Sequence, residues 1–94
     1  MTDEKKHKRV EFSALFNRNI THAPPDMKVA FQEAYELFAE YLNHPALRNH
    51  ILTGKYQDFR SIDVTKDWRA LYRTEPERII FVALGTHETL YGEE

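Results

Sequence analysis

The second half of the chain alternates apolar and polar residues in a way that predicts three consecutive β-strands. In residues 58–65, Ile62 and Val64 share one face, opposite polar neighbours. In residues 68–74, the pattern places Trp68, Ala70 and Tyr72 on one side and Arg69, Leu71 and Arg73 on the other. Residues 78–84 form an almost unbroken apolar run, which is typical of a strand in the middle of a sheet. The polar, proline-containing turn at 75–77 predicts a hairpin between the last two strands.

The first half of the chain has the spacing of helices. Apolar residues recur at helical intervals between positions 26 and 42, namely at Met27, Phe31, Ala34, Tyr35, Phe38, Tyr41 and Leu42. Ser13 is a suitable N-cap for a shorter helix that extends to Ile20, after a possible short strand at 9–12. Residues 46–52 predict a short helical turn that Gly54 closes, with His50 at its end.

Helices followed by a run of strands predict an α+β fold. The N-terminal helices are expected to pack on one face of a small antiparallel sheet of three to four strands. The 94 residues suit a single domain, and no internal repeat or second domain is visible. The charged segment 1–8 is expected to be a flexible lead-in. The opposite face of the sheet carries charged residues, and this face is where a functional site is expected.

Composition removes several classes of protein. The chain has no cysteine, which excludes disulfides and thiolate zinc sites. The histidines lack the His-x-His or His-x₃-His spacing of a ligand pair, so no metal and no cofactor are predicted. No apolar run approaches the roughly 20 residues that span a bilayer, and the N-terminus lacks a secretory apolar segment. A cytoplasmic protein with no membrane partner is expected.

The residues around the predicted sheet include candidate acid–base groups. His87 follows Gly85-Thr86 at the end of the central strand, where a side chain can reach a ligand. Histidine is the natural proton donor or acceptor near neutral pH. His50 precedes the sheet, and Asp67 lies in the bend between two strands. Each also has a structural reading: His87 as a surface or capping residue, His50 as a favourable charge at a helix C-terminus, and Asp67 as a turn carboxylate.

The combination of these motifs resembles the YafQ branch of the RelE/ParE toxin superfamily. The resemblance is carried by His50-x-Leu52-x-Gly54, Phe59-Arg60, Asp67-Trp68, Tyr72, Gly85-Thr86-His87 and Leu90-Tyr91. It implies a RelE-like fold and the toxin of a type II toxin–antitoxin pair. The implied activity is that of a ribosome-dependent mRNA endonuclease that works without a metal. The implied partners are the ribosome, mRNA and a cognate antitoxin, which is expected to contact residues 10–20 and 26–42.

The resemblance also assigns roles to individual residues. The family's catalytic positions correspond to His50, Asp67 and His87, and Asp63 occupies a further family site position. His87 is expected to be the general acid, with His50 or Asp67 as the base. Residues expected to bind the RNA are Arg60, Arg69, Arg73, Tyr91 and Lys55. Arg69 and Arg73 are candidates for binding the scissile phosphate, although ordinary solvated charges would give the same sequence pattern. Tyr91 is a candidate for stacking on a base.

Three features depart from the family pattern. Asp63 stands where the family has a second histidine, and Ala83 stands where it has a phosphate-binding arginine. The net charge of −2 is also low for a protein that contacts RNA. Three functions therefore remain open: the ribosome-dependent endonuclease, a ParE-like toxin that poisons DNA gyrase, and a catalytically weak homologue that only binds an antitoxin.

Overall fold

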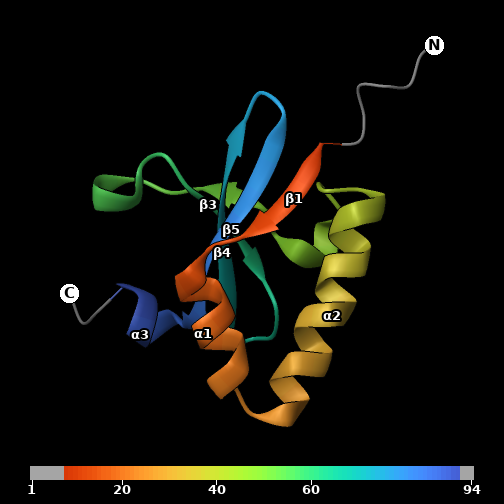
Figure 1. The fold of residues 1–94 in the computed structure, drawn as a ribbon, viewed down its shortest axis with the longest axis vertical. Coiled ribbons are helices and arrows are strands. Elements are labelled where there is room, and N and C mark those ends of the chain that lie inside the picture. The colour runs from red at the N-terminus through yellow and green to blue at the C-terminus, as the bar shows by residue number, and fades with distance from the viewer. Residues whose placement is uncertain (1–7, 92–94) are drawn as a thin grey trace.

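The computed structural model describes residues 8–91. Figure 1 shows α1 and α2 beside a twisted sheet. In chain order the elements are β1 (Arg9–Phe12), α1 (Ala14–His22), α2 (Pro25–Glu40), the 3₁₀ turn η2 (Pro45–Leu47), β2 (His50–Ile51), the 3₁₀ turn η3 (Gly54–Tyr56), β3 (Arg60–Asp63), β4 (Trp68–Glu75), β5 (Arg78–Thr86) and α3 (His87–Tyr91). The expected flexible lead-in lies outside the described residues except for Lys8, whose Nζ donates to the Glu75 carbonyl at 3.0 Å.

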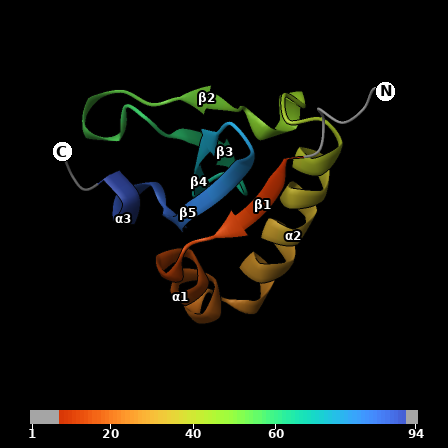
Figure 2. The ribbon, with the colours of Figure 1, turned by 45° about the horizontal axis from the view of Figure 1, so that its top comes forward.

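The α+β class is confirmed, but the expected sheet of three to four antiparallel strands is wrong. The sheet has five strands in the order β1-β5-β4-β3-β2 and is mixed, because β1 runs parallel to β5. A parallel pair needs a long crossover connection, and the chain between β1 and β5 supplies it. Figure 2 shows β1 beside β5 at one edge of the sheet and β2 toward the other. None of the helices within residues 8–91 is long and apolar enough to cross a membrane.

Two boundary predictions also differ from the structure. The long helix ends at Glu40 rather than 42, and Tyr41 and Leu42 are 58% and 41% exposed instead of joining its apolar face. The predicted helical turn over 46–52 stops at Leu47, because Arg48 adopts the left-handed conformation with φ 49° and ends it. His50 therefore starts a strand and does not end a helix.

The core is organised around Phe81, which is completely buried in the middle of β5. Aromatic rings from β1, α1, α2 and β4 have centroids 5.3–6.2 Å from its ring: Phe12, Phe16, Phe31, Tyr35, Phe38 and Tyr72. Edge-to-face and tilted arrangements of this kind add to the free energy gained by burying the rings. The cluster fixes α1 and α2 on one face of the sheet.

A β-bulge at Val82 changes the register of β5. Leu71 pairs with Ala83 but Tyr72 pairs with Phe81, so Val82 is an extra residue on β5. The bulge lets Phe81 and Leu84, three positions apart, both join the core, which strict alternation would forbid. Helix α1 stabilises this irregularity, because Ser13 Oγ donates to the Val82 carbonyl at 2.9 Å and Asn19 Oδ1 accepts from Leu84 N–H at 2.9 Å.

The second face of the sheet is less open than the alternation of polar residues suggested. Ser61, Leu71 and Ala83 on this face are all buried. The η3 segment and α3 fold back over it, and the Tyr56 hydroxyl donates to the Leu90 carbonyl at 2.6 Å. The open part of this face lies beside β2 and the start of β4.

Helix α3 turns back on β5 at Gly85. A Cβ at this buried glycine would lie 2.7 Å from Thr89 Oγ1 and 3.4 Å from Leu90 side-chain atoms. Thr89 Oγ1 is held in place by the Thr86 carbonyl and hydroxyl. Glycine therefore permits the close approach of α3 to the strand.

Replacement of Ser13 by alanine is predicted to destabilise the protein by about 1–2 kcal/mol. The change removes the N-cap bond from Phe16 N–H and the bond to the Val82 carbonyl. Thr21→Ala is the control, because it removes an exposed hydroxyl that donates only to the Asn17 carbonyl. Urea denaturation measures both variants, and equal stability for the two would contradict the role given to Ser13.

Gly85→Ala is predicted to cost about 1–3 kcal/mol through overpacking. We expect the added methyl to move α3, and with it His87 and Tyr91, while the helical core stays intact. Chemical-shift changes in a ¹H–¹⁵N spectrum should therefore concentrate in residues 85–91 and spare α2. Gly54→Ala is the control for backbone strain without overpacking, since that glycine has φ +72° but open space around it. Its spectral changes should be confined to the η3 turn.

Candidate functional site

An open cavity of about 410 Å³ lies between β2, the β3–β4 turn region and α3. Its lining is mostly polar and comes from segments far apart in the sequence: Arg48, His50, Leu52, Thr53, Tyr56, Asp63, Arg69, His87 and Tyr91. The fold thus brings together five of the residues predicted from the sequence to form a site, namely His50, Asp63, Arg69, His87 and Tyr91.

Strand pairing positions the charged centre of the cavity. The antiparallel register of β3 and β4 places Asp63 opposite Arg69, and β2 places His50 opposite Ser61. Directly opposite residues in a sheet have their Cβ atoms about 4.5–5.5 Å apart on one face. The carboxylate and the guanidinium are therefore brought together by the backbone.

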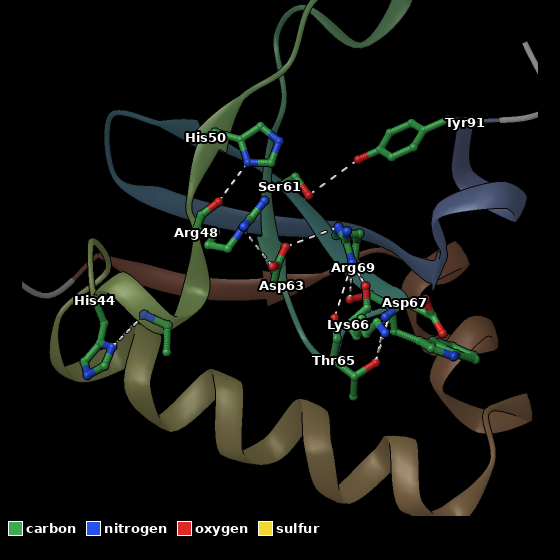
Figure 3. A network of polar contacts seen from close by, with 12 residues as sticks. His44, Arg48, His50, Ser61, Asp63, Thr65, Lys66, Asp67, Arg69 and Tyr91 are labelled. Carbon is green, nitrogen blue, oxygen red and sulfur yellow. Dashed lines mark hydrogen bonds and ion pairs between the residues drawn. The ribbon is translucent and has the colours of Figure 1, made fainter.

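Asp63 lies between two arginines, as Figure 3 shows. Its Oδ2 is 3.2 Å from Arg48 Nε and its Oδ1 is 3.2 Å from Arg69 Nε. Oδ1 is buried and has no aligned hydrogen-bond donor among the described residues, although Arg69 is within ion-pair distance. We therefore regard both contacts as charge pairs and not as directed hydrogen bonds. Two guanidinium groups and one carboxylate leave the cluster with one net positive charge.

The two arginines differ in what else they bind. Arg69 Nη1 donates to the carbonyl oxygens of Thr65, Lys66 and Trp68 at 3.3, 2.9 and 3.3 Å, so this guanidinium ties the β3–β4 turn. Its side chain is only 17% exposed. The Arg48 side chain is 72% exposed. Arg69 is thus largely engaged by protein atoms, whereas Arg48 lines the cavity with most of its side chain exposed.

His50 is oriented by the residue two positions before it. Its Nδ1 lies 2.8 Å from the Arg48 carbonyl oxygen, which can only accept a hydrogen bond. Nδ1 therefore carries the proton in the neutral ring, and the lone pair is on Nε2. A neutral imidazole held in this way can accept a proton at Nε2.

His87 and Tyr91 face the cavity from α3. The two rings have centroids 4.6 Å apart in an edge-to-face arrangement, because they lie four residues apart in one helix. The Tyr91 hydroxyl reaches Ser61 Oγ at 3.4 Å. His87 is exposed, and its backbone N–H donates to the Asp67 carbonyl at 3.0 Å, which anchors α3 to the β3–β4 turn.

Asp67 is not part of the cavity. It lines a separate depression with Thr86, His87 and Glu88. Its backbone N–H reaches Thr65 Oγ1 at 3.3 Å, as expected in a polar turn. The structure thus brings Asp67 next to His87 but places it outside the cavity that contains His50.

Three predicted RNA-binding residues also lie elsewhere. Arg73 is four residues along β4 from Arg69, about 13 Å away at the usual strand rise, and is bound to Glu75 at 2.8 Å. Arg78 and then Arg73 hold the pKa of Glu75 below its ordinary value through hydrogen bonds. Arg60 Nε donates to Asn49 Oδ1 at 2.9 Å, and Lys55 Nζ lies 5.5 Å from the Tyr56 ring centroid, in a neighbouring hollow.

Sequence reasoning missed Arg48 and Tyr56. Arg48 precedes the first strand residue of β2 by two positions, and nothing in the local pattern distinguishes it from a surface arginine. Its left-handed backbone turns it toward Asp63, and no sequence motif indicated that turn. Tyr56 packs against Tyr91, with ring centroids 5.8 Å apart, and lines the same cavity. Within residues 8–91, no three histidine or acidic side chains gather as metal ligands.

The family model and the solved structures that match this chain point to the same family. The model of the family described as "Bacterial toxin of type II toxin-antitoxin system, YafQ" matches residues 8–92. YafQ from E. coli strain BL21(DE3) is similar in structure, with a TM-score of 0.74 and 19% identity, over 92% of this chain and 100% of that one. The E. coli DinJ–YafQ toxin–antitoxin complex gives 0.76 and 20%, over 90% and 98%.

A more distant similarity extends to the wider superfamily. The YoeB/ParE toxin from Agrobacterium tumefaciens has a TM-score of 0.69 at 12% identity, over 84% of this chain and 98% of that one. No protein with a curated description is similar enough in sequence to match. The structural similarities at these identities establish the RelE/ParE-like fold, and the family match covers nearly the whole chain. The chain therefore belongs to the YafQ family of bacterial toxins of type II toxin–antitoxin systems.

Proposed function

We propose that this toxin cleaves mRNA on the ribosome by acid–base chemistry, without a metal ion. The observation that carries the proposal is that His50 and His87 line the same cavity as the cluster of Asp63 with Arg48 and Arg69. Cleavage by the ribose 2′-hydroxyl needs a base at that hydroxyl, an acid at the leaving 5′ oxygen and a cation near the phosphate. The cavity offers all three types of group.

His50 is the better candidate for the base. The hydrogen bond from its Nδ1–H to the Arg48 carbonyl leaves Nε2 free to accept the 2′-hydroxyl proton. Asp67, the alternative base suggested by the sequence, lies in a different depression. Asp63 lies in the cavity, but each of its carboxylate oxygens is already paired with an arginine, at 3.2 Å from Arg48 Nε and 3.2 Å from Arg69 Nε.

His87 takes the role of general acid at the leaving 5′ oxygen. Its exposed ring stands against Tyr91, which supports it edge-on and can offer its own face to a base. The net positive charge of the cluster around Asp63 supplies the electrostatic stabilisation of the phosphorane. In the 2′-hydroxyl mechanism the products are a 2′,3′-cyclic phosphate and a free 5′-hydroxyl.

The proposed protein partner is a cognate antitoxin. The E. coli relative has been crystallised as a toxin–antitoxin complex. In this chain large apolar side chains are exposed on β1, α1 and α2, namely Phe12 at 39%, Leu15 at 46% and Val29 at 58%. These elements coincide with the segments expected from the sequence to contact an antitoxin. The ribosome and its mRNA are the proposed substrate complex, in the bacterial cytoplasm.

His87→Gln is predicted to reduce translation-dependent mRNA cleavage by about 10²–10⁴-fold, the usual contribution of a general acid. The measurement is mapping of mRNA ends by primer extension after induction in a bacterium, with and without the neighbouring antitoxin gene. His22→Gln is the control, because that histidine is exposed in the last turn of α1, away from the cavity.

The same experiment separates the alternative functions. DNA damage that depends on gyrase, without codon-dependent cuts, would indicate a ParE-like poison. A wild-type chain that is neither toxic nor able to cut mRNA, but binds the product of the neighbouring gene, would indicate a binding homologue. Equal cleavage by the His87 and His22 variants would contradict the role given to His87.

A further inference from the structure

The residue that stands out in the cavity without an assigned role is Arg48. It is a non-glycine residue with φ 49° and ψ 47°, in the sparsely populated left-handed region. Backbone strain of this kind persists where the surrounding structure enforces it, and it is concentrated at functional sites. Here the conformation has two consequences, one for the backbone carbonyl and one for the side chain.

The carbonyl and the side chain of Arg48 both act on the site. The carbonyl accepts the hydrogen bond from His50 Nδ1 at 2.8 Å, and the guanidinium is directed to Asp63 at 3.2 Å. Figure 3 shows Arg48 between the imidazole and the carboxylate. A regular helical or strand conformation at this position would not direct both groups as they are.

We propose that Arg48 is the residue that binds the scissile phosphate, and that Asp63 is a positioning residue which holds its guanidinium over the cavity. This inference rests on the proposed function. Arg48 contacts Asp63 through Nε, and no hydrogen bond from its Nη groups to another of residues 8–91 is found. A planar guanidinium held at Nε presents its two Nη groups as a fork, which suits the oxygens of a phosphodiester.

The other arginines fit this role less well. Arg69 uses Nη1 for three backbone carbonyls and Nε for Asp63, so its main task is to tie the turn. Arg73 and Arg60 bind Glu75 and Asn49, outside the cavity. Ala83, where the family has an arginine, lines an apolar cavity on the same sheet face. Arg48 thus supplies, from the β2 edge of the sheet, the cation that position 83 lacks.

The charges agree with a single phosphate. Arg48, Arg69 and Asp63 together carry one positive charge, which one phosphodiester would neutralise. The Arg48–Asp63 contact is an ion pair at 3.2 Å, which tolerates more tilt than an aligned hydrogen bond, so the Arg48 guanidinium can turn toward a phosphate without leaving the carboxylate. Asp63, which occupies the place of a family histidine, then acts through Arg48 and does not need to exchange a proton.

The test compares Arg48→Gln with Arg9→Gln. Both changes remove one arginine of similar exposure, 72% and 66% of the side chain, but Arg9 lies on β1 at the opposite edge of the sheet. We expect Arg48→Gln to lower translation-dependent cleavage at least tenfold and Arg9→Gln to change it less than twofold. Arg48→Lys should recover part of the loss, because it restores the charge without the fork.

A binding measurement separates a phosphate contact from a structural role. The probe is ribosomes programmed with an mRNA whose riboses carry 2′-O-methyl groups, which the proposed reaction cannot cut. Loss of one phosphate contact should reduce the slope of log affinity against log salt by about 0.7 for a single strand. Arg48→Gln should show this change and Arg9→Gln should not. Asp63→Asn should keep the wild-type slope, since the cation remains, but lower the cleavage rate.

The outcomes distinguish the two proposals. If the wild-type chain neither binds these ribosomes nor cuts mRNA, the proposed function fails, and with it this inference. If the wild type cuts mRNA but Arg48→Gln matches Arg9→Gln in cleavage and in salt slope, the assignment of Arg48 alone is overturned. The assignment would also be overturned, in favour of a structural role, by a third result. In that case Arg48→Gln lowers cleavage, Arg48→Lys does not restore it, and the salt slope is unchanged.

Discussion

The burial of Phe81 is the interaction on which the rest of the structure depends. The strand that carries it contacts β1 on one side and β4 on the other, while its ring receives aromatic neighbours from both long helices. A ring of this size, completely buried, contributes several kcal/mol through apolar burial and packing. Because Phe81 and Leu84 both face the helices, the strand must accommodate an extra residue between them. The bulge at Val82 follows from that demand.

The bulge in turn determines the site. It sets the register in which Arg69 lies opposite Gly85 and Trp68 lies opposite Thr86. A one-residue slip would move every side chain of this part of the sheet to the other face. The end of β5 would then direct α3 away from the cavity. Ser13 and Asn19 satisfy the backbone groups at the irregularity, so the N-terminal helix contributes to the position of His87 although it is far from it in sequence.

This arrangement gives a physical explanation for two features that the resemblance did not predict, Asp63 and the low net charge. At position 63, where the resemblance predicts a histidine, the aspartate has its two carboxylate oxygens 3.2 Å from Arg48 Nε and 3.2 Å from Arg69 Nε. The low net charge of the chain says little about this cavity, where the central cluster is positive. At the hairpin end, by contrast, Glu75 pairs with Arg73 and Arg78. Affinity for RNA depends on the local field and not on the sum over the chain.

The sequence by itself determined the α+β class, the three strands of the second half, the N-cap at Ser13 and the long amphipathic helix. These features are encoded by periodicity and by capping chemistry, which act between residues near one another in the chain. His50 and His87 were predicted as site residues through the family resemblance, and the structure places both in the lining of one cavity. The tertiary structure alone decided the parallel pairing of β1, the bulge at Val82, the left-handed turn at Arg48 and the exclusion of Asp67, Arg60 and Arg73 from the cavity. Each of these features depends on which distant segments share a face of the sheet. The burial of Phe81 and the strand register decide which segments those are.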